Sequence, residues 1–247
     1  MQQKTLILGA TSAIAAEVAK ICAERGDELY LVGRNPDKLR AVVAAVGDGV
    51  VGFESCDFHE VALADERVAR WIEQLGGLDR ALIAHGYLGD QERSEREVSY
   101  AQQVIDTNFV SVVSLLMPLA NFFASQGRGH LAAITSVAGE RGRPRNYTYG
   151  AAKSGLTCYL EGLRSRLYKR GVCVHNLKLG PVATPMSEGH PQNMLWGEKR
   201  QVAGAIVRAL GRRRHVVYAP RSWRLVMAIV RCLPERVFQR FGFLAGR

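Results

Sequence analysis

The sequence predicts an α/β protein built on a doubly wound, seven-stranded parallel sheet with helices on both faces. Short β-branched runs alternate with longer segments of helical period between residues 1 and 220, without a repeat, a low-complexity tract or a linker. This alternation indicates parallel pairing, because parallel neighbours need crossover connections and helices supply them. The chain has 247 residues, 47% hydrophobic and 23% charged, which suits one domain over residues 1–220 and a tail over residues 221–247.

Seven apolar runs are expected to form the strands. They span residues 6–8, 29–32, 50–53, 81–84, 131–134, 172–179 and 216–218. Helix signals separate them: Pro36 is typical of the first turn of a helix over residues 36–46, and Gly26 ends the helix before it. A doubly wound sheet binds its ligands at the carboxyl ends of the strands, so the residues after each run are the candidates for chemistry.

The first run is followed by a loop of small residues and then by a helix. The loop reads Gly9, Ala10, Thr11, Ser12, Ala13, Ile14, Ala15. Its backbone N–H groups and the dipole of the helix would receive a pyrophosphate, and Gly9 permits the tight turn. A dinucleotide-binding loop usually has glycine where Ala13 and Ala15 stand. Each added methyl group leaves less room for the backbone to approach the phosphate or the sheet. Taken alone, the loop is equally well explained as an ordinary strand-to-helix turn.

The residues after the second and third runs bear on the choice of cofactor. Gly33, Arg34 and Asn35 stand where an acidic side chain would bind a ribose 2′-hydroxyl group. A cation at this place favours the 2′-phosphate of NADP over NAD, the alternative being a solvated surface arginine. Asp57 either meets the adenine amino group or caps a helix that begins near Phe58. The predicted cofactor is therefore NADP(H).

A phenol and an ammonium group are expected on one face of the helix that follows the fifth run. Tyr149 and Lys153 are four positions apart, which is one helical turn. A phenol with a pKa of about 10 is a poor acid–base group at neutral pH, and a neighbouring cation stabilises phenolate, so Lys153 is expected to lower the pKa of Tyr149. Ser136 follows the strand that ends at residue 134, where its hydroxyl group can bond a substrate carbonyl that faces Tyr149.

Asn108 is a polar residue inside an apolar helix expected over residues 104–119. A buried amide must be paired. Two interpretations stay open: Asn108 orders a water molecule beside Lys153 and maintains a proton relay, or its amide is satisfied by the local backbone.

The order and spacing of these groups resemble the short-chain dehydrogenase/reductase superfamily over residues 4 to about 220. The resemblance is carried by Gly9, Asn108, Ser136, Tyr149, Lys153 and the segment 180–184. It implies a Rossmann-type subunit, hydride transfer from a nicotinamide, and a homodimer or homotetramer. In the family's roles Tyr149 is the general acid–base, Ser136 orients the carbonyl, Lys153 lowers the tyrosine pKa and binds ribose, and Asn108 supports the relay. The expected cofactor-binding residues are Gly9, Thr11, Ser12, Ala13, Ile14, Arg34, Asp57, Ala84, His85, Gly86, Tyr149, Lys153, Pro181, Val182 and Thr184.

The chain departs from the family pattern at several positions. After the fourth run the family has Asn-Asn-Ala-Gly, and this chain has Ile83, Ala84, His85 and Gly86. The family also usually has proline before the glycine that corresponds to Gly180, and this chain has Leu179 there. His85 is either a contact to the nicotinamide ribose or a packed loop histidine. Thr184 resembles the residue that contacts the nicotinamide carboxamide, its alternative being a helix cap.

Two further segments bear on the substrate. Residues 185–200 lose periodicity and gather Met186, Met194 and Trp196, which is typical of a substrate lid with an apolar inner face. Residues 199–247 hold twelve Lys and Arg against one acid, and a stripe from Trp223 to Leu233 combines apolar and basic residues. A helix with both kinds of residue is better suited to bind a lipid surface than nucleic acid. The alternative interpretation is that the apolar stripe packs on the protein itself or on a sister subunit.

The tail and the loop at Gly9 are similar to a narrower group of reductases that includes the decaprenylphosphoryl keto-pentose reductases. The leading hypothesis is an NADPH-dependent reductase of ketones or aldehydes on an apolar or lipid-linked substrate, in the cytoplasm and peripheral to the inner membrane face. A second hypothesis makes the substrate a soluble acyl, steroid-like or xenobiotic carbonyl. A third is a non-catalytic NADP-binding regulator, against which the complete set Ser136, Tyr149 and Lys153 argues.

Cysteine and histidine spacing predicts no metal site. The five cysteines are scattered and never spaced as C-x-x-C, which also excludes a disulfide framework and favours a reducing compartment. His85 has no second histidine or cysteine at a spacing typical of a metal ligand set.

Overall fold

The computed structural model describes residues 2–185 and 194–240. Its strands are β1 (Lys4–Leu8), β2 (Glu28–Gly33), β3 (Val50–Ser55), β4 (Arg80–Ile83), β5 (Gly129–Ser136), β6 (Val172–Leu179) and β7 (Val216–Ala219). They form one parallel sheet in the order β3-β2-β1-β4-β5-β6-β7. Every predicted run overlaps one of these strands, and the predicted fold class is confirmed.

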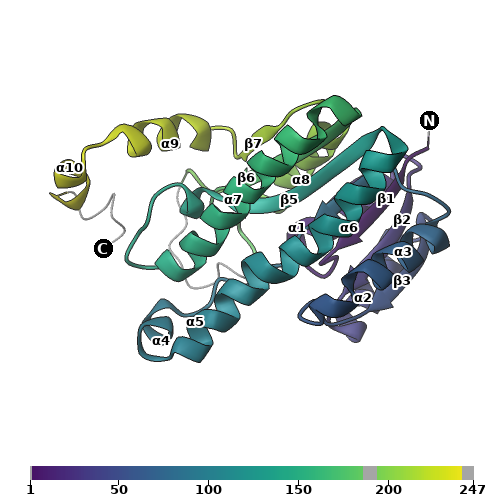
Figure 1. Cartoon of the computed structure of the whole chain (residues 1–247), viewed down its shortest axis with the longest axis horizontal. Coiled ribbons are helices and arrows are strands. Elements are labelled where there is room, and N and C mark those ends of the chain that lie inside the picture. Colours follow the sequence, from purple (N-terminus) through teal and green to yellow (C-terminus); the bar gives the residue numbers. More distant parts are fainter. Residues whose placement is uncertain (1, 186–193, 241–247) are drawn as a thin grey trace.

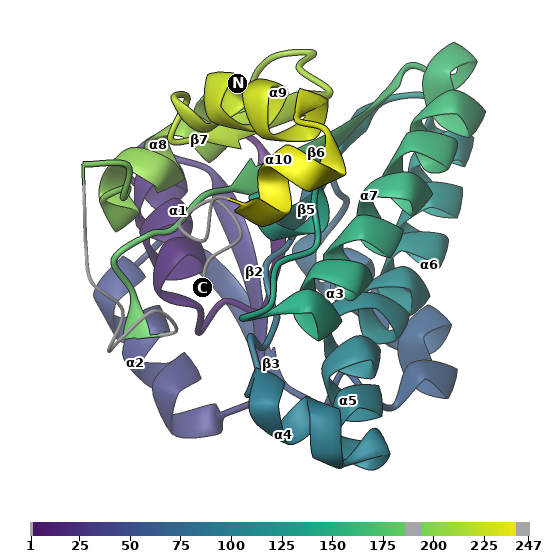
Figure 2. The same cartoon turned by 90° about the vertical axis from the view of Figure 1, so that its left-hand side faces the viewer.

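Two layers of helices enclose the sheet (Figures 1 and 2). The helices are α1 (Ala13–Ala23), α2 (Pro36–Val46), α3 (Ala64–Leu75), α4 (Gln91–Arg96), α5 (Val98–Ile105), α6 (Ser111–Gln126), α7 (Tyr147–Leu167), α8 (Lys199–Leu210), α9 (Trp223–Cys232) and α10 (Glu235–Arg240). Apolar side chains of α3, α6 and α7 pack on one face of the sheet, and those of α1, α2 and α8 pack on the other. Short single turns are η1 (Val61–Leu63), η3 (Val137–Gly139) and η4 (Tyr168–Arg170).

The helix expected over residues 104–119 is longer than predicted and contains an irregular turn. α5 continues through the π-helical turn η2 (Asp106–Val110) into α6. The whole stretch Val98–Gln126 is long and apolar enough to span a membrane by length and composition. Its inner side supplies Leu116, Leu119 and Phe123 to the core beneath the sheet, as expected of a core helix.

The C-terminal helices pack on the domain beside the carboxyl end of β5. Trp223, Met227 and Val230 of α9 and Phe238 of α10 are buried and form a small cluster with Val137, which directly follows β5. Figure 1 shows α9 and α10 at the opposite side of the molecule from the N-terminus. Most of the apolar stripe seen in the sequence is therefore turned toward the protein's own body.

Candidate active site

The loop between β1 and α1 leaves backbone donors for a ligand. Gly9 has φ +84°, a conformation that favours glycine, and its N–H group donates to Val32 O at 2.8 Å. The side chain of Ser12 makes no capping hydrogen bond, and the first turn of α1 carries no acidic residue. An anion can therefore take up the donors at the start of α1.

The two alanines that replace loop glycines lie in different surroundings. Ala15 is fully buried and belongs to the core between α1 and the sheet, whereas Ala13 is half-buried at the start of the helix. The methyl group of Ala15 is thus part of helix–sheet packing. Only Ala13, with Thr11, Ser12 and Ile14, borders the place where a pyrophosphate would lie.

His85 follows β4 and meets the same loop. A Cβ atom on Gly9 would stand 2.4 Å from the His85 nitrogen, so the two backbones touch only because Gly9 lacks one. The Ser111 hydroxyl donates to Thr107 O at 2.9 Å and accepts from His85 Nε2 at 2.9 Å, which leaves Nδ1 as a buried acceptor with no partner among the described residues. Burial lowers the pKa of His85 to about 3, so the ring is neutral. An unpaired acceptor at this place fits a ligand hydroxyl group.

Arg34 and Asp57 lie at the carboxyl ends of β2 and β3. Arg34 is exposed directly after β2, and its carbonyl oxygen accepts from Ser55 Oγ at 3.0 Å. The carboxylate of Asp57 accepts from His59 N at 3.0 Å, which lowers its pKa. Residues 57–60 contain no helix, and the first helical turn begins at Val61, so the interpretation of Asp57 as a cap of a helix near Phe58 is wrong.

The structure brings Ser136, Tyr149 and Lys153 together. α7 places Tyr149 and Lys153 on successive turns, and Lys153 Nζ lies 5.7 Å from the centre of the Tyr149 ring. Ser136 is the last residue of β5, and its hydroxyl group donates to Leu179 O at 3.4 Å and accepts from Ala138 N at 3.1 Å. The same hydroxyl group is close enough to the Tyr149 phenol to act on its pKa. The turn after Ser136 can rest on α7 because Gly139 and Gly150 have no Cβ; at each, an added Cβ would lie under 3 Å from backbone of the other segment.

The ionisation of this pair differs from the sequence-based prediction. Burial raises the pKa of Tyr149 to about 12, and the nearby Ser136 hydroxyl group acts in the opposite direction. Lys153 is 2% exposed, burial lowers its pKa to about 8, and its ammonium group donates to Ile134 O at 3.1 Å. The net direction of the tyrosine pKa shift therefore differs from the expectation, because burial of the phenol outweighs the effects that lower the pKa, and the contribution of Lys153 stays a prediction.

Asn108 holds the loop that follows β4. Its Nδ2 atom donates to Tyr87 O at 2.6 Å and to Val104 O at 2.8 Å, and its Oδ1 atom accepts from Tyr87 N at 3.1 Å. The backbone thus satisfies the buried amide, as the second interpretation requires. A Cβ on Gly86 would stand 2.9 Å from Asn108 Oδ1 and 3.4 Å from Lys153 Nζ, so Gly86 passes between these two side chains.

The remaining predicted residues lie near the ends of β4 and β6. Ala84 and Val182 are buried, and Pro181 and Thr184 are half-buried. Of the proposed lid, Met186 lies outside the described residues, Met194 is fully exposed, and Trp196 is half-buried. Gly197 returns beside the end of β6 through backbone hydrogen bonds to Pro181 and Ala183.

A buried ion pair that the sequence analysis missed supports the Ser136 turn. Lys178 of β6 donates to Glu140 Oε1 at 2.5 Å, and the Tyr218 hydroxyl donates to the same oxygen at 2.6 Å. The side chains of Lys178 and Glu140 are 7% and 4% exposed. Glu140 follows the turn η3, so this contact ties the catalytic loop to β6 and β7. No local signal reveals the contact, since its members are far apart in the sequence.

Comparison with known proteins assigns the fold and the site to one family. The family model described as short chain dehydrogenase matches residues 3–194. The chain is 35% identical over 238 residues to the uncharacterized oxidoreductase Rv2073c of Mycobacterium tuberculosis, covering 95% of each protein. It is 34% identical to an uncharacterized oxidoreductase of Streptomyces coelicolor, covering 95% of this chain and 94% of the relative.

A solved structure has the same fold. The crystal structure of levodione reductase superposes with a TM-score of 0.79 at 23% identity, covering 88% of this chain and 96% of that one. The strand order and the grouping of Ser136, Tyr149 and Lys153 agree with the sequence matches. The chain therefore belongs to the short-chain dehydrogenase family and is an oxidoreductase of the NAD(P)-dependent type.

Proposed function

We propose that this oxidoreductase reduces a ketone or aldehyde on an apolar or lipid-linked substrate, with NADPH as the hydride donor. The single observation that carries the proposed chemistry is the grouping of the Ser136 hydroxyl group, the buried Tyr149 phenol and the buried ammonium group of Lys153. A pKa of about 12 keeps Tyr149 protonated at neutral pH. A protonated phenol can donate to an oxygen, which suits reduction of a carbonyl group.

The chain's own residues would serve this reaction in sequence. Ser136 bonds the carbonyl oxygen and holds it beside the phenol of Tyr149. As hydride adds to the carbonyl carbon, the proton of the Tyr149 hydroxyl group passes to the oxygen and an alcohol forms. The resulting phenolate is stabilised by the nearby ammonium group of Lys153 until it recovers a proton from solvent. Asn108 fixes the loop at Gly86 and so keeps Lys153 in place.

The preference for NADPH rests on the end of β2. Gly33 is followed by the exposed cation Arg34, and exposed Lys38 lies on the first turn of α2. Asn35 accepts from Lys38 N at 2.9 Å and caps α2. No acidic side chain occupies residues 33–35 to bind a 2′-hydroxyl group, and two cations stand near the place of a 2′-phosphate.

An apolar or lipid-linked substrate is supported by the outer face of α9. Leu225 and Ile229 are 69% and 55% exposed and lie one turn apart. Arg221 and Arg224 are exposed at the start of the same helix. Because α9 begins next to Gly180 and packs near Ser136, an apolar and cationic surface lies beside the catalytic groups. Such a surface suits attachment to an anionic bilayer.

A second candidate is a reductase of a soluble carbonyl compound. The observation that favours it is the burial of Trp223, Met227 and Val230, through which α9 completes the domain. In that case the tail serves folding or assembly as a homodimer or homotetramer.

The substrate class is tested by turnover and by lipid binding together. Purified protein is assayed with NADPH and NADH against ketones of increasing chain length, and floated with vesicles containing anionic lipid at low and high salt. The lipid-linked proposal predicts rising kcat/KM with chain length and salt-sensitive flotation. Flotation should be lost in Leu225→Ser/Ile229→Ser and kept in the control Val98→Ser, which changes an 84% exposed residue on α5. Turnover of soluble ketones with no flotation would favour the second candidate.

A further inference from the structure

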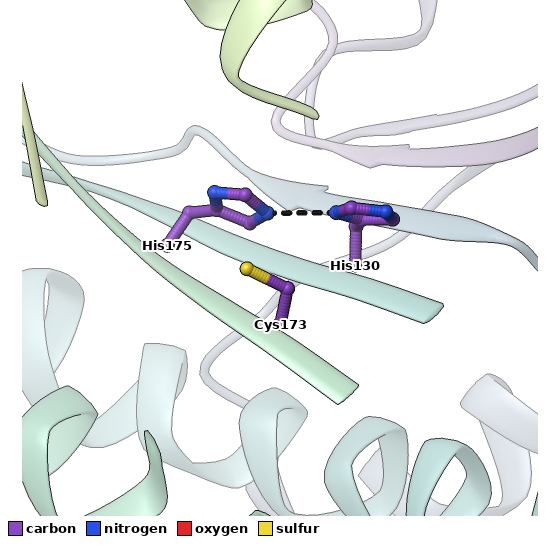
Figure 3. Close-up of side chains that lie close together, drawn as sticks. All are labelled: His130, Cys173 and His175. Atoms are coloured by element: carbon purple, nitrogen blue, oxygen red, sulfur yellow. Dashed lines mark hydrogen bonds between the residues drawn. The ribbon is translucent and has the colours of Figure 1, made fainter. Parts of the chain in front are cut away.

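A cluster of nitrogen and sulfur ligands lies at the amino ends of β5 and β6, away from the catalytic groups. His130 is the second residue of β5 and pairs in register with Cys173 of β6. His175 is two residues further along β6, so it shares a face of the sheet with Cys173. Figure 3 shows the three side chains turned toward one another, and one ligand atom from each lies within 4.8 Å of the others.

Hydrogen bonds fix the protonation of the two imidazole rings. His175 Nδ1 lies 2.6 Å from Arg214 O, and a carbonyl oxygen only accepts, so Nδ1 carries the proton. His175 Nε2 is therefore a lone pair, and it accepts from His130 Nδ1 at 3.0 Å. A ring nitrogen oriented by a backbone carbonyl on its other side is the arrangement that metal-binding histidines adopt in proteins.

His215 lies next to the cluster and contacts the sulfur atom of Cys173. Its Nδ1 atom lies 3.3 Å from Val174 O, so it is a donor, and it lies 3.7 Å from Cys173 Sγ. A donor directed at sulfur supports a thiolate. Because this nitrogen holds its proton, His215 is an outer partner of the cluster, and His130, Cys173 and His175 supply three possible ligands.

We propose that His130, Cys173 and His175 bind one divalent transition-metal ion of the zinc class. Two imidazole nitrogens and a thiolate match the ligands that zinc prefers, and ligand separations in a tetrahedral zinc site are about 3.3–3.8 Å. His130 Nδ1 and His175 Nε2 lie 3.0 Å apart and are joined by one hydrogen bond. Small rotations of the two side chains would make room for an ion between these atoms. On binding, the thiol proton passes to solvent, sulfur bonds the metal, and the His130 proton moves from Nδ1 to Nε2.

Some features of the residues around the cluster favour binding of a metal ion, and others oppose it. Cys173 and His175 are buried and His130 is half-buried, so the packed strands hold the three ligand side chains in place, which favours binding. Burial of the Cys173 sulfur disfavours its thiolate, Arg213 and Arg164 oppose this effect, and both arginines repel a cation. We therefore expect weaker binding than in closed structural zinc sites.

A bound ion would link β5 and β6 near their amino ends, whereas Ser136 lies at the carboxyl end of β5. Ser136 lies six positions after His130 along β5, which corresponds to about 20 Å. A metal ion here touches no group of the proposed reaction. Its expected effect is on stability, because an ion that binds only the folded chain stabilises it.

Cobalt titration tests the proposal through the thiolate. The chain is expressed without a histidine tag, reduced, freed of metal by dialysis against a chelator, and titrated with Co²⁺ and then Zn²⁺. We expect one equivalent of Co²⁺, a sulfur-to-cobalt charge-transfer band, displacement by Zn²⁺, and a higher Tm with either ion. Cys173→Ser should lose the band, and His130→Gln should bind at least about 100-fold more weakly, since loss of even an outer partner costs 10–100-fold.

The matched control is Cys158→Ser, which changes an exposed cysteine of α7 and should titrate like the wild type. Far-UV circular dichroism of each metal-free variant checks folding, and the wild-type spectrum decides the question even if a variant fails to fold. A wild-type chain with no thiolate band at saturating Co²⁺, or a band that survives in Cys173→Ser, would overturn the proposal.

Discussion

The two halves of the sheet use different chemistry. The half around β1–β3 presents backbone and small side chains to its ligand: Gly9 at a tight turn, Ala13 beside it, and Arg34 on the surface. The half around β5–β7 buries ionisable groups, including Lys153 and the Lys178–Glu140 pair. The first half also buries charge, in the ion pair of Asp27 with Arg80, but that pair lies at the amino ends of its strands, away from Gly9 and Arg34. We therefore expect the first half to bind the cofactor and the second half to hold charge and protons at the reacting groups. Substitutions in the first half should therefore change KM for the cofactor, and those in the second should change kcat.

Tyr149→Phe should produce the largest effect. Removing the phenolic hydroxyl group removes the proton donor while leaving the ring in place, so kcat for carbonyl reduction should fall by about 10²–10⁴-fold. NADPH affinity, measured by quenching of protein fluorescence, should stay within twofold. A large loss of cofactor affinity with unchanged kcat would reverse the assignment of the two halves.

Arg34→Gln should change cofactor binding and leave the rate of the chemical step nearly unchanged. Loss of a charged partner for the 2′-phosphate should raise KM for NADPH by about 10–100-fold, with KM for NADH and kcat nearly unchanged. Steady-state kinetics with both cofactors measures this. Equal effects on NADPH and NADH would show that Arg34 is only a surface cation.

Lys153 predicts the pH dependence of reduction. Its pKa is lowered to about 8, so the ammonium group is present below that pH and is lost as the pH rises through it. Reduction should fall above pH 8 by about tenfold per pH unit, because the forming phenolate loses its stabilising charge. Lys153→Arg keeps a cation and should abolish this fall even if its plateau is lower. An unchanged profile in Lys153→Arg would assign the fall to another group.

Gly86→Ala tests the contact between the two halves and should have the smallest effect. The new methyl group would stand 2.9 Å from Asn108 Oδ1 and 3.4 Å from Lys153 Nζ. We expect a loss of stability of about 1–3 kcal/mol from overpacking. We also expect kcat to fall roughly three- to tenfold as Lys153 is displaced. The control Gly142→Ala has nothing within 4 Å of the added atom and should match the wild type in kcat and Tm.

Local patterns in the sequence predicted which of the proposed catalytic residues lie close together. Tyr149 and Lys153 are neighbours through one helical turn, and Ser136 follows from the end of a strand. The position of the ammonium group could not be predicted, because it depends on the carbonyl of Ile134 in another element. The tyrosine pKa is raised and not lowered because the phenol is buried, and its burial depends on packing that a local pattern does not show.

Contacts across strands were beyond the reach of local patterns. Glu140 and Lys178 meet only through the packing of η3 on β6, and His130 meets Cys173 only through the register of β5 and β6. The prediction of no metal ligands rested on linear spacing, and pairing of strands brings residues 43 positions apart to one place, as residues 130 and 173 show. The irregular turn η2 likewise contains Asn108, whose side chain bonds the loop after β4, a contact that the local sequence does not show.

Transfer of deuterium from the cofactor tests the central claim most directly. Wild-type protein and Tyr149→Phe are incubated with NADPH carrying deuterium at the transferable position and with the best ketone of the substrate panel. The account predicts an alcohol with one deuterium on the former carbonyl carbon from the wild type, and at least about 100-fold less from the variant at equal cofactor occupancy. Equal labelling by both proteins, or binding of NADPH by the wild type without transfer to any ketone or aldehyde, would contradict it.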